Sequence, residues 1–148
     1  MVYTGMLDVH AFGMMAAVLL FVTTELLLFA GGRARLARFA LYASRFGNML
    51  AMIGMLAGIG LIYLGGWPLT TPWLLFSFVL IAIMMVVSRR FVRPWQQRFQ
   101  AAVAGASHAD LDALAGDRRA LVGRAAVLAL FVLVAATMML KPELAQLT

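Results

Sequence analysis

The stretch "FGNMLAMIGMLAGIGLIYLGGWPLTTPWLLFSFVLIAIMMVVS", residues 46–88, contains no Asp, Glu, Lys or Arg. A charge-free run of this length is too long for a helix in the core of a soluble protein. A helix of about 20 apolar residues crosses the hydrocarbon core of a membrane. The breakers Gly65, Gly66, Pro68 and Pro72 lie near the middle of the run. We therefore expect two membrane-spanning helices joined by a turn.

The composition of the whole chain agrees with a membrane protein. Of its 148 residues, 64% are hydrophobic and 12% are charged, whereas a soluble domain carries about 25% charged residues. Cysteine is absent, which excludes disulfides, thiolate metal sites and cysteine nucleophiles. No positive charge precedes the first apolar segment, so we expect a retained helix and not a signal peptide.

Hydropathy and breaker residues predict an all-α, polytopic four-helix bundle that forms one membrane domain over residues 1–148. The connection 94–120 is expected to be partly helical, with Ser107 and Asp110 forming a capping box. The four membrane helices are expected at residues 7–30, 44–65, 72–92 and 121–140.

Sequence signals for the helix ends accompany these spans. "GGR" at residues 31–33 is expected to stop the first helix. Thr71 is expected to be the N-cap of the third helix, with Pro72 at its first position. Pro94 is expected to end or kink that helix, and Lys141–Pro142 to stop the fourth.

The basic residues predict the orientation of the chain. Eleven of the twelve lie in the two connections that join the first to the second and the third to the fourth helix, or at the helix ends next to them, and only Lys141 lies on the opposite side. By the positive-inside rule, both termini face outward and both arginine-rich connections face the cytoplasm. The eleven are Arg33, Arg35, Arg38, Arg45, Arg89, Arg90, Arg93, Arg98, Arg118, Arg119 and Arg124.

The segment "RRFVRPWQQRF", residues 89–99, has two readings. Its arginines serve as topology signals, or they bind anionic lipid headgroups while Phe91, Trp95 and Phe99 anchor the strip at the interface. The placement of the positive charge argues against a nucleic-acid partner.

A stripe of small residues on the second helix predicts close packing of helices. Gly47, Ala51, Gly54 and Gly58 follow one another at spacings of four, three and four, and Gly54–Gly58 forms a GxxxG motif. The first helix, the fourth helix and a second subunit are all candidate partners for this face.

Glu25 stands in the apolar stretch "FVTTELLLF", residues 21–29. A charge at the bilayer centre costs about 3 kcal/mol, and pairing offsets this cost. Arg45, Asn48 and Arg124 lie at a comparable depth, so we expect a structural ion pair or hydrogen bond with one of them. The alternatives are a proton-relay or substrate-binding carboxylate and simple snorkelling.

His10 lies near the outer end of the first helix. Fifteen residues separate it from Glu25, which places the two about 60° apart around the helix axis and about 22 Å apart along it. Both residues are expected on the side that faces the bundle interior. His10 is a candidate ligand for haem or copper or a candidate proton carrier; the alternative is a histidine satisfied by water or a carbonyl. His108, the other histidine, lies across the membrane, so a bis-histidine haem within one chain is not expected.

His10, the arginine-led second helix, "GGWPLTTPWLLF" (residues 65–76) and the ending "MMLKPEL" (residues 138–144) together carry a resemblance. The chain resembles small bacterial four-helix membrane proteins related to the CopD-type copper-resistance domain and the HemJ-type protoporphyrinogen oxidase, and is most similar to an uncharacterised branch. The resemblance implies the fold, Arg45 and Lys141–Pro142 as family-like features, and haem or metal at His10. "TPWLLFSF", residues 71–78, lacks the lysine of the oxidases.

Three functions remain open from the sequence. No compact catalytic set is evident, so we expect a non-catalytic accessory factor, assembly factor or subunit of the bacterial inner membrane. This protein would associate with itself or another membrane protein through the glycine face of its second helix. The alternatives are a membrane redox protein that handles haem b or, less readily, copper through His10, and a proton-coupled transporter that uses Glu25.

Overall fold

The computed structural model describes residues 1–30, 34–105 and 107–144, and every regular element in these ranges is helical. Four spans are long and apolar enough to cross a membrane: Val2–Phe29, Arg35–Leu64, Pro72–Ala104 and Arg118–Met138. The predicted helical class is therefore confirmed, and the number of described helices that could cross a membrane equals the predicted four. The elements are α1 (Val2–Phe29), α2 (Ala34–Leu64), α3 (Pro72–Val87), the π-helical turn η1 (Ser88–Val92), α4 (Arg93–Ala104), α5 (His108–Ala115) and α6 (Arg118–Leu144).

Several helices are longer than the predicted spans. Helix α2 begins ten residues before the predicted residue 44, because the Arg, Leu and Ala residues there favour a helix with or without a membrane. Helix α6 continues through Pro142 to Leu144, so the predicted stop at Lys141–Pro142 is wrong; a proline in the last turn removes only one backbone donor. The predicted "GGR" stop lies outside the described residues.

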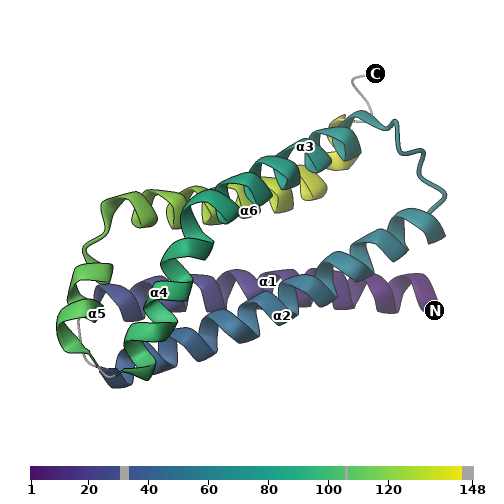
Figure 1. Ribbon diagram of the computed structural model, residues 1–148. Coiled ribbons are helices and arrows are strands. Elements are labelled where there is room, and N and C mark those ends of the chain that lie inside the picture. Colours follow the sequence, from purple (N-terminus) through teal and green to yellow (C-terminus); the bar gives the residue numbers. More distant parts are fainter. Residues whose placement is uncertain (31–33, 106, 145–148) are drawn as a thin grey trace.

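The four long helices form two antiparallel pairs, and each pair is called a hairpin below (Figure 1). Helix α1 packs along α2, and α3 packs along α6. The hairpins approach each other at the end that carries α4 and α5, and they diverge toward the end where α1 starts and α6 stops (Figure 1). The bundle is thus closed at one end and open at the other.

The helical path from α3 to α4 bends through η1 (Figure 1). Pro94 lies in the first turn of α4, and a π-helical turn next to a proline is a common cause of a sharp bend. Gly123 of α6 allows close approach here, because a Cβ on it would lie 2.5 Å from the Cβ of Phe91. The predicted kink therefore falls at residues 88–94.

Two predicted caps occupy their positions. Thr71 is the N-cap of α3, with Pro72 at the first position, but its hydroxyl donates to the Pro68 carbonyl at 2.6 Å and does not cap the helix. Ser107 caps α5 and accepts a hydrogen bond from the Asp110 backbone N–H at 3.4 Å.

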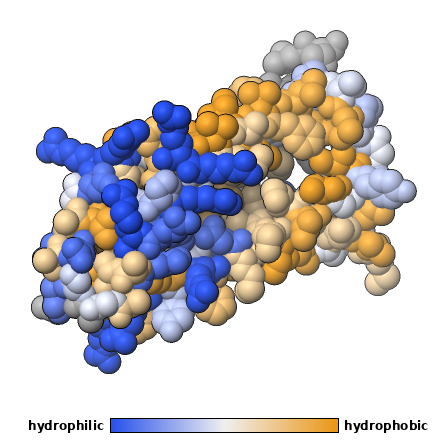
Figure 2. Space-filling view, viewed as in Figure 1, coloured by the Kyte–Doolittle hydropathy of each residue, from blue (hydrophilic) through white to orange (hydrophobic). Residues whose placement is uncertain are grey.

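The main hydrophobic core lies at the arginine-rich end. Hydrophilic side chains gather over α4 and α5, whereas apolar side chains cover much of the rest of the visible face (Figure 2). Trp95 and Phe99 are buried in this core and stack at 4.9 Å between ring centroids, so the prediction that they anchor at the membrane interface is wrong. The core consists of Leu28, Ala37, Ala40, Trp95, Phe99, Ala102, Leu111 and Ala120.

The glycine face of α2 packs against α1 of the same chain. A Cβ on Gly47 would lie 3.0 Å from the Phe21 ring, and one on Gly54 would lie 2.8 Å from the sulfur of Met14. Of the three partners that the sequence left open for this face, the structure places α1 there. The small residues let the two backbones come close, and van der Waals packing then holds the helices together in lipid.

We predict that Gly47→Leu destabilises the α1–α2 hairpin, because the new side chain meets the Phe21 ring and overpacking costs about 1–3 kcal/mol. Thermal unfolding of the protein in detergent would measure the effect. Gly5→Leu is the matched control, since a Cβ there meets nothing within 4 Å and the gain in helix propensity is the same. Equal melting temperatures for the two variants would contradict this packing.

Candidate functional site

Glu25 and Arg124 form an ion pair that joins the two hairpins. The Nε of Arg124 on α6 donates to Glu25 Oε1 at 2.8 Å and to Oε2 at 3.1 Å on α1. The Arg124 side chain is only 7% exposed and that of Glu25 is 20% exposed. A buried charge of this kind is stable in an apolar segment only when it is paired.

The Trp95 ring lies over the guanidinium group of Arg124. The Arg124 guanidinium carbon lies 4.0 Å from the Trp95 ring centroid, a cation–π contact that strengthens as water is removed. The Trp95 indole N–H donates to the Leu114 carbonyl at 2.9 Å. Glu25, Arg124, Trp95 and Leu114, hereafter the arginine cluster, therefore connect α1, α6, α4 and α5.

The arginine cluster contains one buried nitrogen that has no hydrogen-bond partner among the described residues. Arg124 Nη1 is buried, and no acceptor in the described part of the chain reaches it. An arginine offers five N–H donors, and the bond to Glu25 is made through Nε. An acceptor from outside the chain, such as a water molecule, would satisfy Nη1.

Arg45 and Asn48 are not the partners of Glu25. Both are exposed, and among the described residues neither makes an ion pair or side-chain hydrogen bond. The reason is geometric: Gly47 points toward α1, and the next residue of a helix lies about 100° further around the axis. Of the three predicted partners, the structure brings only Arg124 to Glu25.

His10 lies in the seam between α1 and α2. Its Nδ1 is 2.6 Å from the Gly54 carbonyl oxygen, and its ring lies against Gly58, where a Cβ would be 2.9 Å from His10 Cε1. A carbonyl oxygen only accepts, so Nδ1 carries the proton and, in the neutral ring, Nε2 holds the lone pair. His10 is thus satisfied on one side by a carbonyl, which is one of the roles that the sequence predicted.

The face of α1 that carries these residues is the buried one. Ala17 and Thr24 are buried, and His10 and Glu25 are half-buried, as expected for a side that faces the interior. Within residues 1–30, 34–105 and 107–144, no three His, Cys, Asp or Glu side chains gather as a ligand set for a metal ion.

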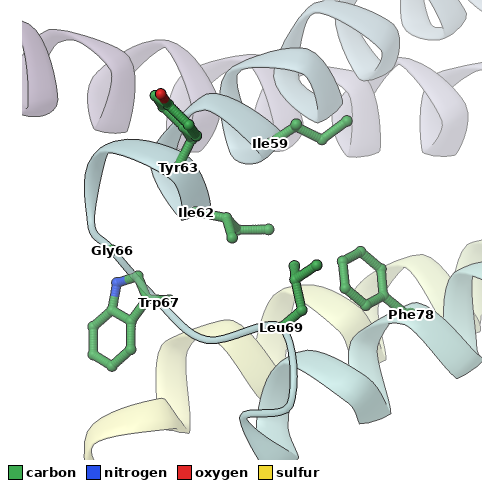
Figure 3. A pocket seen from close by; sticks show the side chains of 7 residues that line it. All are labelled: Ile59, Ile62, Tyr63, Gly66, Trp67, Leu69 and Phe78. Atoms are coloured by element: carbon green, nitrogen blue, oxygen red, sulfur yellow. The ribbon is translucent and has the colours of Figure 1, made fainter.

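A cleft opens between the hairpins at the end opposite the arginine cluster. It has a volume of about 480 Å³. Side chains from the end of α2 face side chains from the following turn and from α3 across it (Figure 3). The lining residues are Ile59, Ile62, Tyr63, Gly66, Trp67, Leu69 and Phe78.

Sequence reasoning missed both the role of Trp95 and the cleft. Trp95 belongs to a basic, aromatic segment that resembles an interfacial anchor, and nothing local indicates that α4 turns back onto Arg124. The spacing of Ile59, Ile62 and Tyr63 indicates one helix face, but the separation of that face from α3 is a tertiary property.

Comparison with known proteins adds no family. A scan against protein-family models, a search of curated proteins and a search of solved structures each found no match. The resemblance to the CopD-type and HemJ-type families stays a prediction.

We predict that Glu25→Gln and Arg124→Gln each destabilise the fold by about 2 kcal/mol, because each leaves a charged partner without its counter-ion. The double variant should lose less than the sum, with a coupling of about 1 kcal/mol or more. Unfolding in mixed micelles would measure all three. Asp8→Asn on α1, which removes an exposed carboxylate, is the control; strictly additive losses would contradict a direct interaction.

Proposed function

We propose that this chain is a non-catalytic, multi-pass membrane protein, an accessory factor, assembly factor or subunit, that associates with another membrane protein or with a second copy of itself. In this proposal it resides in a bacterial inner membrane, with both termini outside and the arginine-rich end in the cytoplasm. The one-sided distribution of arginine supports this orientation.

The observation that carries the proposal is that polar side chains within the spans are bonded to other groups of the same chain. Arg124 holds Glu25, and the Gly54 carbonyl holds His10. The buried hydroxyls donate to carbonyls of their own helices: Thr24 to Leu20, Ser77 to Trp73 and Thr137 to Leu133. These groups stabilise the fold, and the apolar outer surface remains as the means of interaction.

The outer face of α2 is the surface best suited to a protein partner. Since α1 covers the glycine face, association has to use another face. Phe46, Met49, Ile53 and Leu56 follow one another at spacings of three, four and three, and all are exposed. They lie more than 90° around the helix from the glycines, and methionine adapts readily to the shape of a partner.

We predict that this face crosslinks to a partner in native membranes. Because the chain has no cysteine, Ile53→Cys provides a single reactive position on the outer face. After the thiol is labelled with a maleimide that carries a benzophenone, illumination should give a crosslinked species of defined size several-fold more efficiently than with Leu19→Cys, an exposed position on α1. Equal or absent crosslinking, together with a monomer after mild solubilisation, would refute the association.

A second candidate, haem or copper handling, is favoured by the orientation of His10. A histidine that ligates a metal usually donates its other ring N–H to a carbonyl or carboxylate, and His10 Nδ1 lies against the Gly54 carbonyl in this way. Nε2 is the atom that would hold the metal ion or haem iron.

Optical spectra of the protein, oxidised and then reduced with dithionite, test this candidate. A near-stoichiometric Soret band that shifts on reduction is expected if His10 holds haem, and His10→Ala should abolish it. His108→Ala in α5 should leave the band unchanged. A featureless spectrum from a haem-sufficient preparation, or retention of haem by His10→Ala, would remove this role; metal analysis applies the same comparison to copper.

A further inference from the structure

The cleft between α2 and α3 lies among membrane-spanning helices. Ile59 and Ile62 belong to the last turns of α2, and Phe78 belongs to the first half of α3. Figure 3 shows Ile59 and Ile62 on one wall, facing Leu69 and Phe78 on the other. Because Ile59, Ile62 and Phe78 belong to helices apolar enough to cross a membrane, hydrocarbon is the medium expected next to this part of the cleft.

The same face of α2 continues deeper into the span. Asn48, Met52, Met55 and Ile59 are separated by four, three and four residues and are all exposed. At about 100° per residue they form one stripe that leads into the cleft lining. The uncovered surface therefore extends along α2 for roughly 17 Å from Asn48 to Ile59.

The lining determines what can fill the cleft. Four aliphatic or phenyl side chains form the facing walls (Figure 3). Water needs two to four polar partners to occupy a site, and cavities lined by such side chains stay dry. An empty space of this size would cost the walls their contacts, so an apolar occupant is expected.

The volume separates a hydrocarbon chain from a helix. A helix is about 10 Å wide and covers about 80 Å² in cross-section, so a space of 480 Å³ would hold about 6 Å of it, or roughly four residues. A hydrocarbon chain has a contact width of about 4 Å and fits lengthwise. The cleft volume also lies in the range of roughly 300–1,000 Å³ that is typical of small-molecule sites.

The residues at the end of α2 suit the region between hydrocarbon and headgroups. Tyr63 and Trp67 lie at the α2–α3 turn, and tyrosine and tryptophan are enriched at the level of the lipid headgroups. A molecule with its polar head at this turn and its chain directed along Ile62, Ile59 and Met55 would match both environments.

We propose that this cleft is a binding site for one acyl chain of a membrane phospholipid, whose headgroup lies at the α2–α3 turn. The site is separate from the arginine cluster and from the outer face of α2. The bound chain fills the space between the hairpins and keeps their open end apart. This inference does not depend on the proposed function, because a lipid can fill the cleft whether or not a protein partner is bound.

Native mass spectrometry of the protein, purified in mild detergent and exchanged into nanodiscs of phosphatidylglycerol, tests the site. We expect the wild-type chain to retain about one phospholipid after gentle release. Ile62→Trp fills the cleft and should reduce retention several-fold. Leu19→Trp is the matched control, because it adds the same indole at an exposed position on α1, away from the cleft lining, and should retain the lipid.

Leu69→Trp is a second test that keeps the outcome clear if Ile62→Trp fails to fold. Leu69 lies in the turn and not in a helix, so its replacement changes the cleft with little effect on the spans, and it should also reduce retention. No retained lipid in the wild type, or equal retention by all variants, would overturn the proposal. A second copy crosslinked through Ile62→Cys in intact membranes would overturn it too, by assigning the cleft to a protein.

Discussion

The need to neutralise one buried arginine organises this protein. Arg124 sits in α6 where the membrane span begins, with its side chain almost fully enclosed. Glu25 supplies the opposite charge from α1, and Trp95 supplies an aromatic face from α4. Without its partner, each charged side chain would be less stable in the apolar segment than in water. The ion pair between them holds the two hairpins together at the arginine-rich end. The bend at η1, next to Pro94, directs α4 so that Trp95 reaches the arginine.

The two ends of the molecule are held by different forces. At the arginine-rich end, Trp95, Phe99 and Leu111 are buried among small residues, and the hydrophobic effect stabilises this compact cap wherever water surrounds it. Within the spans, lipid solvates apolar side chains as well as protein does, so close packing at glycines holds α1 against α2. Between α2 and α3 neither force acts strongly, and the hairpins separate there into a cleft.

This division assigns different roles to the polar residues that the sequence singles out. Glu25 and His10 are both engaged within the chain, one by a guanidinium and the other by a carbonyl. The engagement of Glu25 stabilises the junction of the hairpins. That of His10 leaves Nε2 with its lone pair, which is why a cofactor remains a second candidate. Arg45 and Asn48 stay exposed because the packing of Gly47 against α1 turns them away from it.

The helical class, the number of apolar spans and the need of Glu25 for a partner can be predicted from the sequence, because charge spacing and hydropathy act locally along the chain. The sequence also identified Arg124 as one of three partners and the glycine stripe as a packing face. Three further features are properties of the three-dimensional fold: Arg124 is the partner of Glu25, the stripe faces α1, and α2 and α3 separate around a cleft. These outcomes depend on the rotation of each helix about its axis and on the bend at residues 88–94, and hydropathy carries no information about either.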